Sequence, residues 1–271
     1  MMQLQNKTIL ITGSTDGIGK QTALELAEMG ATVIVHGRDA NRVKSAVEEI
    51  HRSVRGAKVE SAVADLSSLK QVRQMAEHIQ SQFPRLDILI NNAGVYMKTL
   101  VLSEDGYEIT FAVNHLAHFL LTNLLLALLK KSAPARIITV SSGVHTSTKL
   151  DFQNLNAENH FEPYAVYALS KLGNVLFSNE LAEHLKGTSV TSNSLHPGVI
   201  GTKMLRSAFN MSGASVKEGA ETSVYLAAST DVEGISGKYF VSKHEAPAAP
   251  MTNDKDLRKR FWEKSKELVG I

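Results

Sequence analysis

The fold of this chain is decided by residues 8–19, TILITGSTDGIG, where a short apolar run meets a cluster of glycines. The run Thr8–Thr12 is rich in β-branched residues and predicts a strand, and the periodic apolar residues of Gly17–Met29 predict a helix. Glycine permits a tight turn between them and the close approach of a ligand, and the helix N-terminus offers unpaired N–H groups to a phosphate. The stretch therefore predicts the strand–turn–helix unit of a dinucleotide-binding fold, with a plain turn as the alternative.

The alternation of strand and helix continues along the chain. Further strands are predicted at residues 32–36, 58–63, 86–90, 135–140, 189–195 and 237–241, and further helices at residues 40–52, 67–82, 110–130, 163–185, 216–228 and 255–269. Regular alternation favours a parallel sheet covered by helices on both faces. We therefore expect one α/β domain over residues 1–271, a doubly wound Rossmann fold with a parallel sheet of about seven strands. Within it, residues 199–215 are predicted to be a substrate flap without regular structure, and residues 251–271 a C-terminal helical tail.

The composition is that of an ordinary globular protein of 271 residues, 43% of them hydrophobic and 21% charged. The absence of cysteine excludes disulfides, thiolate metal sites and cysteine nucleophiles, and we expect no bound metal. Basic and acidic residues nearly balance, with a net charge of +2 and no basic block, so nucleic acid is not an expected partner. No signal-peptide pattern precedes the first strand, and the apolar run 111–129 carries several polar residues. We therefore expect a cytoplasmic protein without a membrane anchor.

The end of the second predicted strand bears on the choice of cofactor. Gly37 and Arg38 stand where a dinucleotide fold meets the adenosine ribose, about twenty residues beyond the glycine loop. An acidic residue there would accept from the 2′-hydroxyl of NAD(H), whereas an arginine would bind the 2′-phosphate of NADP(H). The sequence thus predicts NADP(H) as cofactor, with NAD(H) as the second option. Arg38 could instead be an ordinary surface charge, and Asp16 in the glycine loop would oppose a phosphate.

Polar residues follow three of the predicted strands, at the edge of the sheet where ligands bind in such folds. They are Asp65, the run Asn91–Gly94 and the pair Ser141-Ser142. Each of them could alone be a helix cap or a turn residue, and for Asp65 the two interpretations carry equal weight.

Tyr167 and Lys171 stand four residues apart in a predicted helix that begins at Pro163. Residues at i and i+4 lie on the same helix face, so the ammonium group can sit beside the phenol. A neighbouring cation stabilises phenolate and would lower the phenol pKa from about 10 towards the working pH of a general acid and base. The alternative is a solvated helix face, which is the common origin of an isolated Tyr-x-x-x-Lys.

Taken together in their order, these motifs resemble the fingerprint of the short-chain dehydrogenase/reductases. The matching positions are Thr12–Gly19, Asn91–Gly94, Asn114, Ser142, Tyr167 with Lys171, and Pro197-Gly198. Within that family the sequence is most similar to the retinol dehydrogenase group, through Asp105–Glu108, Val113–Thr122, Ser170–Phe177, His196–Val199, Phe261-Trp262 and Glu267–Ile271. The resemblance spans nearly the whole chain.

The resemblance implies four catalytic residues, namely Asn114, Ser142, Tyr167 and Lys171. Tyr167 would exchange a proton with the substrate, while Lys171 would lower the pKa of Tyr167 and hold the nicotinamide ribose. Ser142 would bind the substrate oxygen, and Asn114 would support a proton relay through water. Ser142 is preferred to Ser141 because it matches the family position and because successive residues leaving a strand point to opposite sides. The residues expected to bind the cofactor are Gly13, Ser14, Thr15, Asp16, Gly17, Ile18, Gly19, Arg38, Asp65, Leu66, Asn92, Ala93, Gly94, Val113, Tyr167, Lys171, Pro197, Gly198, Val199 and Thr202.

The sequence thus predicts an NADP(H)-dependent oxidoreductase that transfers a hydride between the nicotinamide and a carbonyl or alcohol, with an apolar aldehyde, ketone or alcohol as substrate. One alternative is a dinucleotide-binding sensor without catalysis. Another is an epimerase or dehydratase of the related extended branch, whose glycine loop is spaced differently from the Gly-x-x-x-Gly-x-Gly found here. In the family a pair of long apolar helices forms a subunit interface. The predicted helices 110–130 and 163–186 are such a pair, so we expect a homodimer or homotetramer.

Overall fold

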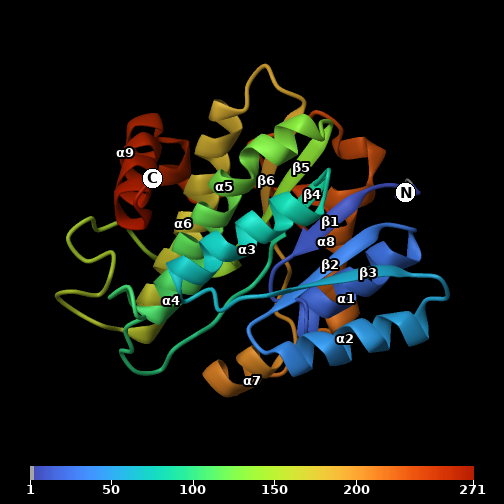
Figure 1. Ribbon diagram of the computed structural model, residues 1–271. Coiled ribbons are helices and arrows are strands. Elements are labelled where there is room, and N and C mark those ends of the chain that lie inside the picture. Colours follow the sequence, from blue (N-terminus) through green and yellow to red (C-terminus); the bar gives the residue numbers. More distant parts are fainter. Residues whose placement is uncertain (1–2) are drawn as a thin grey trace.

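Eight strands form one sheet in the computed structural model, which describes residues 3–271 (Figure 1). They are β1 (Thr8–Ile11), β2 (Thr32–Gly37), β3 (Lys58–Val63), β4 (Ile88–Asn91), β5 (Ala135–Val140), β6 (Val190–His196), β7 (Tyr239–Val241) and β8 (His244–Glu245). Their order in the sheet is β3-β2-β1-β4-β5-β6-β7-β8, and β1 to β7 pair in parallel. This arrangement confirms the predicted doubly wound α/β fold.

The sheet ends in a strand that the sequence did not predict, β8, which pairs antiparallel with β7. Ser242 and Lys243 join the two strands, with φ of 49° and 69°. A two-residue hairpin turn of this kind needs positive φ at both positions, and Asn-Gly is its usual sequence signal. Ser-Lys carries no such signal, so the sequence alone did not indicate the hairpin.

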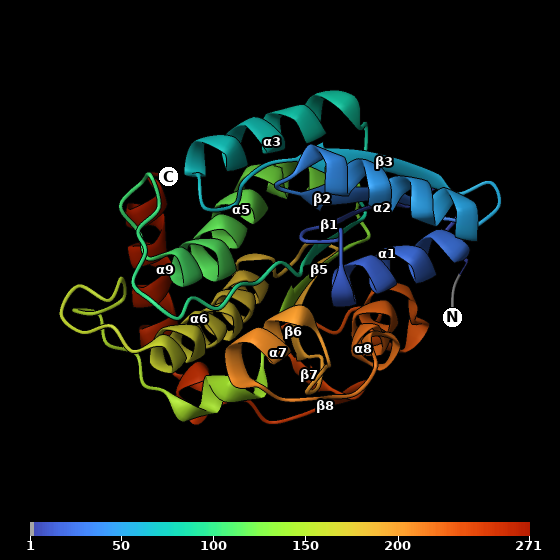
Figure 2. The ribbon, with the colours of Figure 1, turned by 90° about the horizontal axis from the view of Figure 1, so that it is seen from below.

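Helices cover both faces of the sheet, as Figure 2 shows from below. One face carries α1 (Gly17–Glu28), α2 (Ala40–Ser53) and α8 (Val216–Ala228), and the other carries α3 (Leu69–Gln82), α5 (Ala117–Lys131) and α6 (Pro163–His184). Alternate residues of β1 serve the two cores, because Ile9 and Ile11 pack on the side of α1 and Leu10 packs on the side of α5. All three are fully buried, as expected for a central strand covered on both faces.

The predicted helix 110–130 is not a uniform α-helix. It starts as the short α4 (Ile109–Phe111), widens into the π-helical η1 (Ala112–Leu116) and continues as α5. At the end of η1 the N–H of Ala117 donates to the carbonyl of Ala112, five residues back instead of four. Single π-turns are frequent at functional sites, and this one contains Asn114.

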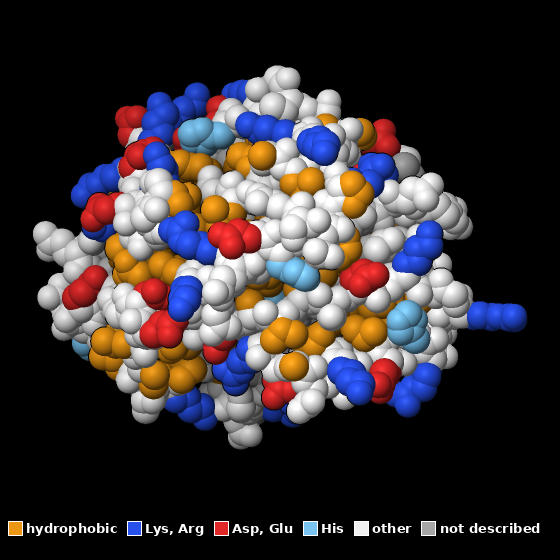
Figure 3. All heavy atoms as spheres, in the orientation of Figure 1, with side chains coloured by type: hydrophobic (Ala, Val, Ile, Leu, Met, Phe, Trp, Pro, Cys, Tyr) orange, Lys and Arg blue, Asp and Glu red, His pale blue; other side chains and the backbone are white. Residues whose placement is uncertain are grey.

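The apolar segment Ile109–Lys131 is long and apolar enough to cross a membrane by composition alone. In this structure 78% of its most apolar window is buried, mainly against α3 and the sheet. This agrees with the interpretation of the apolar run as a core helix. On the face drawn in Figure 3, Lys and Arg side chains are interspersed with Asp and Glu, as the balanced composition predicts.

The flap predicted at residues 199–215 contains a helix, α7 (Lys203–Phe209), so the prediction of an irregular segment is wrong in this respect. Thr202 caps its first turn by accepting from the N–H of Leu205 at 3.2 Å. Asn210 ends it with a left-handed φ of 51°, which asparagine tolerates better than most residues. The two caps make a seven-residue helix out of a stretch with little apolar periodicity.

The C-terminal tail forms helix α9 (Lys255–Val269), which packs on α6 and α5 of the same chain (Figure 1). Phe261 and Trp262 are buried, and the Trp262 ring lies 4.8 Å from Phe119 and 5.9 Å from Phe177, centroid to centroid. Helices α5 and α6, on which α9 packs, are the two helices for which the sequence predicts a subunit interface. The homodimer or homotetramer stays a prediction, and an interface through these helices would have to use the surface that α9 leaves free.

We expect Trp262→Ala to lower the free energy of unfolding by about 3–5 kcal/mol, because it removes a large buried ring from an aromatic cluster. Urea denaturation of the purified variant measures the change. Lys259→Ala, on the exposed side of the same helix, is the control and should change the value by less than about 0.5 kcal/mol. Equal stability of the two variants would show that α9 is not docked as described.

Candidate active site

A cleft of about 420 Å³ opens at the carboxyl ends of the parallel strands. Most of the predicted site residues line it, namely Gly13, Thr15, Asp16, Gly17, Ile18, Gly19, Arg38, Asp65, Leu66, Asn92, Ala93, Gly94, Val113, Tyr167, Lys171, Pro197 and Thr202. The predicted residues that do not line it are Ser14, Asn114, Ser142, Gly198 and Val199. Residues of the lining that the sequence did not single out include His36, Arg42, Lys203 and Arg206.

The glycine loop leaves room for a dinucleotide. Gly17 has a φ of 54° and begins α1, and a Cβ added there would meet only a methyl group of Thr202, at 3.5 Å. Gly13 is required by packing instead, because a Cβ there would come within 2.8 Å of the Cα of Ala93. The N-terminal end of α1 therefore borders open space, and the residues present fit a pyrophosphate at this position.

Ser14 fixes the glycine loop, and its expected part in cofactor binding stays a prediction. Ser14 is fully buried, its hydroxyl donates to the Ile11 carbonyl at 2.7 Å, and its N–H donates to the His36 carbonyl at 2.9 Å. The hydroxyl also accepts from the His36 N–H, at 2.9 Å. The hydroxyl and the N–H of Ser14 are thus used to fix the glycine loop to β1 and β2.

The ring of His36 holds the same loop. The Gly13 N–H donates to Nδ1 at 3.0 Å, and Nε2 lies 3.1 Å from the Ala64 carbonyl. Burial lowers the pKa of His36 to about 4, so the ring is neutral at pH 7 and its proton is on Nε2. In the sequence, His36 stands at the end of a predicted strand, and no local pattern marks it as part of the site.

Four charged side chains gather at the β2 end of the cleft. Arg38 and Arg42 line it, and Asp16 pairs with Lys203 at 2.7 Å and with Arg42 at 3.3 Å. The hydrogen bond from Lys203 is the largest cause that holds the pKa of Asp16 below its usual value. Because Lys203 and Arg42 neutralise the Asp16 carboxylate, Asp16 should repel a bound phosphate only weakly.

The loop after β4 is held by Thr12 and His118. The Thr12 hydroxyl accepts from the N–H groups of Asn92 and Ala93, at 2.9 Å and 3.0 Å, and lies 2.9 Å from Nε2 of His118. Nδ1 of His118 lies 3.0 Å from the Asn114 carbonyl, so Nδ1 carries the proton and Nε2 accepts from Thr12. Burial lowers the pKa of His118 to about 3, which keeps the ring neutral. The sequence did not single out His118.

The Asn114 side chain connects this loop to α6. Oδ1 accepts from the Val95 N–H at 2.8 Å, and Nδ2 donates to the Val95 carbonyl and to the Ser170 hydroxyl, each at 3.0 Å. The Ser170 hydroxyl in turn donates to the Tyr167 carbonyl at 2.8 Å. Asn114 is therefore a buried link beside Tyr167, and its part in a proton relay stays a prediction.

Tyr167, Lys171 and Ser142 meet beside the cleft. Tyr167 is 6% exposed and Lys171 3%, and the Lys171 Nζ lies 5.7 Å from the centroid of the tyrosine ring. The expectation that Lys171 lowers the pKa of Tyr167 is not met. Burial raises the pKa of Tyr167 to about 12, against a smaller lowering by the nearby Ser142 side chain. Burial also lowers the pKa of Lys171 to about 8, and its amino group donates to the Val140 carbonyl at 3.1 Å.

Some of the polar residues that follow the strands hold the backbone in place, and others lie where a ligand could contact them. Ser141 lines the cleft, but its hydroxyl donates to the Lys171 carbonyl at 2.7 Å, whereas the Ser142 side chain lies near Tyr167 and affects its pKa. Asp65 lines the cleft and also accepts from the N–H and hydroxyl of Ser67, at 2.9 Å and 2.8 Å. The turn-forming and ligand-facing interpretations of Asp65 are therefore compatible.

Aromatic rings pack near Tyr167 on the side of α7. Phe209, the last residue of α7, lies 4.8 Å from Tyr96 and 6.4 Å from Tyr167, centroid to centroid. Tyr96 lies 5.5 Å from Tyr167. A substrate that reaches the Tyr167 phenol would therefore contact apolar ring surface contributed by Tyr96 and Phe209.

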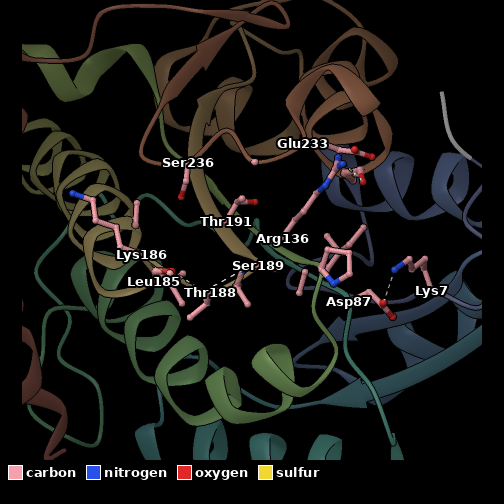
Figure 4. Close-up of a pocket in the computed structure, with 18 of the residues that line it drawn as sticks. Lys7, Asp87, Arg136, Leu185, Lys186, Thr188, Ser189, Thr191, Glu233 and Ser236 are labelled. Carbon is pink, nitrogen blue, oxygen red and sulfur yellow. Dashed lines mark hydrogen bonds and ion pairs between the residues drawn. The ribbon is translucent and has the colours of Figure 1, made fainter.

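A larger cavity of about 550 Å³ lies at the opposite edge of the sheet, where the strands begin (Figure 4). None of the predicted site residues lines it. Most of its charged groups already have partners within the protein, since Lys7 pairs with Asp87 at 2.9 Å and Arg136 donates to the carbonyls of Leu226 and Ala227. The predicted chemistry therefore belongs to the cleft at the carboxyl edge.

Comparison with known proteins agrees with this geometry. The sequence profile of a family described as short chain dehydrogenase matches residues 7–213. Retinol dehydrogenase 14 of Homo sapiens is 42% identical over 294 residues, which cover 99% of this chain and 88% of that protein. Retinol dehydrogenase 12 of Bos taurus is 41% identical over 279 residues, which cover 100% of this chain and 88% of that protein.

Solved structures share the whole fold. An uncharacterised protein from Mycobacterium paratuberculosis matches with a TM-score of 0.84 at 29% identity, over 100% of this chain and 96% of that one. A short chain dehydrogenase from Escherichia coli CFT073, solved in complex with NADPH, matches with a TM-score of 0.74 at 26% identity, over 89% of this chain and 98% of that one.

Lys171→Met is expected to stabilise the protein at neutral pH. The folded pKa of about 8 lies below the 10.5 of an exposed lysine, so between these values the unfolded chain binds more protons and the free energy of unfolding rises with pH. Below about pH 8 the buried Lys171 is protonated, and its burial then lowers the free energy of unfolding by the full amount, roughly 3 kcal/mol. The Val140 carbonyl keeps a donor in the variant, because Asn174 Nδ2 also lies 3.1 Å from it.

Chemical denaturation of the native protein and of Lys171→Met at pH 7 and pH 10 measures this effect. The native protein should gain stability relative to the variant as pH rises, whereas the exposed Lys70→Met should follow the native protein. An identical pH dependence of the native protein and Lys171→Met would contradict the burial of a titrating lysine.

Proposed function

Because the chain belongs to the short-chain dehydrogenase/reductase family, and within it to the retinol dehydrogenase-like group, we propose that it is an NADP(H)-dependent oxidoreductase of carbonyls and alcohols. Tyr167 is its acid and base, and its substrate is an apolar aldehyde, ketone or alcohol. The proposal includes the cytoplasmic location and the homo-oligomeric state expected from the sequence.

The observation that carries the proposal is the contact of Tyr167 with Ser142 beside a cleft that fits a dinucleotide. A bound nicotinamide cofactor supplies or accepts the hydride. Ser142 and Tyr167 bring two hydroxyl groups together, so a substrate oxygen can accept a hydrogen bond from each. In carbonyl reduction Tyr167 gives its proton to the forming alkoxide, and in alcohol oxidation it takes the proton back.

The pKa values of Tyr167 and Lys171 are both compatible with proton transfer to and from the substrate oxygen. Since burial raises the pKa of Tyr167 to about 12, the phenol holds its proton at neutral pH, which is the form needed to protonate an alkoxide. The pKa of Lys171, about 8, lies near the working pH, so its amino group can change charge as the phenol does. The ring surfaces of Tyr96 and Phe209 favour an apolar substrate.

The preference for NADP(H) is supported by the β2 end of the cleft. Arg38 and Arg42 line it, and position 37 excludes a carboxylate side chain because a Cβ there would lie 2.5 Å from the Thr15 methyl. A 2′-phosphate would gain charge-assisted hydrogen bonds there, and a 2′-hydroxyl would find no carboxylate after β2. The Escherichia coli relative solved with NADPH has the same fold.

A dinucleotide sensor without catalysis is the second candidate function. It would need the cleft, but it would not need a phenol and an amino group buried beside it at a cost in stability. Turnover of a carbonyl separates the two functions, because a sensor binds the cofactor and leaves it unchanged.

Tyr167→Phe is expected to lower kcat by ~10²–10⁴-fold, because it removes the proton that general acid catalysis supplies. The dissociation constant for NADPH, measured by fluorescence titration, should stay within about threefold of native, since the ring remains. Tyr164→Phe, one turn earlier and partly exposed, is the matched control and should keep native kcat. A loss below tenfold in Tyr167→Phe would remove Tyr167 from the mechanism.

Arg38→Asp is expected to reverse the cofactor preference. The native protein should favour NADPH over NADH by roughly tenfold to a hundredfold in kcat/KM, because contacts to a phosphate contribute about 1.5–3 kcal/mol each. Steady-state kinetics with both cofactors measures the ratio, with Arg52→Asp on the far part of α2 as control. Equal efficiency in the native protein, or an unchanged ratio in Arg38→Asp, would make Arg38 an ordinary surface charge.

A further inference from the structure

His145 lies three residues beyond Ser142, on the 3₁₀ turn η2 (Gly143–Ser147), and is 1% exposed. Its ring does not line the cleft, and no sequence motif places His145 in the site. Both of its ring nitrogens are nevertheless hydrogen-bonded, each to the backbone of a different part of the chain.

The protonation of the ring follows from these two bonds. Nδ1 lies 2.7 Å from the Ser142 carbonyl, and the Ala249 N–H donates to Nε2 at 3.0 Å. Since an amide N–H can only donate, Nε2 is the acceptor, and the proton is on Nδ1, which donates to Ser142. Burial lowers the pKa of His145, and this favours the neutral ring that the geometry requires.

The partner on the far side of the ring is itself fixed. The Ala249 carbonyl accepts from the N–H and the hydroxyl of Thr252, at 2.8 Å and 2.7 Å. The Thr252 carbonyl accepts from Arg258 at 3.1 Å, and the same guanidinium pairs with Glu180 of α6 at 3.2 Å. Arg258 and Glu180 are buried, so the segment before α9 rests on the body of the protein and gives His145 a firm support.

Ser142 is held from both sides by the backbone around it. On one side the Ser141 N–H donates to the Leu195 carbonyl at 2.7 Å. On the other, the Ser142 carbonyl receives the Nδ1 proton of His145 and, at 3.2 Å, the N–H of the same residue. Without the ring, the second side would keep the longer of the two hydrogen bonds to the Ser142 carbonyl and the bond from the Val144 N–H to the Ser142 hydroxyl, at 3.4 Å.

We propose that His145 is a positioning residue, which braces Ser142 against the segment before α9 and so fixes the position of the Ser142 hydroxyl beside Tyr167. The inference rests on the proposed function, because it matters for turnover only if Ser142 and Tyr167 act on a substrate oxygen. A displacement of about 1 Å at such a group can lower the rate by ~10²-fold.

The test compares three variants with an aldehyde that the native protein reduces with NADPH. His145→Phe keeps the ring volume and removes both hydrogen bonds, and we expect kcat to fall by ~10–100-fold while the dissociation constant for NADPH stays within about twofold. His145→Gln can still donate and accept, and should recover at least about fivefold of the loss. Ile50→Ala, in the core under α2, destabilises the protein without touching Ser142 and should keep native kcat at a temperature where it is folded.

Failure of the positioning role and failure of the proposed function would give different results. A kcat within about threefold of native in His145→Phe, or a comparable fall in Ile50→Ala, would overturn the positioning role and leave the proposed function intact. A native protein that binds NADPH but reduces no carbonyl would overturn the proposed function, and the positioning role with it. Nitrogen-15 NMR of the native imidazole provides a check without turnover, because a proton on Nε2 of His145 would contradict the bracing geometry.

Discussion

A lysine amino group buried at the end of β5 is the constraint on which this structure depends. Lys171 is 3% exposed, donates to the Val140 carbonyl, and has a pKa lowered to about 8 by burial. Such a group costs stability, and the surroundings support it, since Asn174 shares the same carbonyl and the Ser141 hydroxyl fixes the Lys171 backbone. Proteins keep destabilising groups of this kind where chemistry needs them. The Tyr167 phenol lies one helical turn away, and the acid and base role proposed for it is the chemistry that this group would serve.

Three neutral histidines hold the loops around that phenol. His36, His118 and His145 each use both ring nitrogens to join separate segments, and burial lowers the pKa of each. A neutral imidazole presents one donor and one acceptor in a fixed geometry, so it can join a carbonyl to an N–H or a hydroxyl without burying a charge. The glycine loop, the loop after β4 and Ser142 are thereby held in set positions, which is the preorganisation that a reaction between two bound molecules requires.

The sheet and most of the cleft could be predicted because they follow from local patterns. Strand and helix periods gave the alternation, and parallel strands carry the residues after their carboxyl ends to one edge. The features that the sequence did not predict depend on contacts between segments that are distant in the chain. The hydrogen bonds of the Ser14 hydroxyl to β1 and β2 could not be predicted from the glycine loop alone, and the pKa of Tyr167 is raised by its burial rather than lowered by its spacing from Lys171. The π-turn at Asn114 and the hairpin at Ser242 carry little local signal.

The central claim is that a hydride passes between a nicotinamide and a carbonyl carbon in this cleft. Its most direct test is the reduction of a panel of apolar aldehydes and ketones with NADPH that carries deuterium at both C4 positions, followed by mass spectrometry of the alcohols. The account predicts an alcohol with one deuterium on the former carbonyl carbon, formed only when the protein is present. Bound NADPH with no labelled alcohol from any member of the panel would contradict it and would favour the sensor.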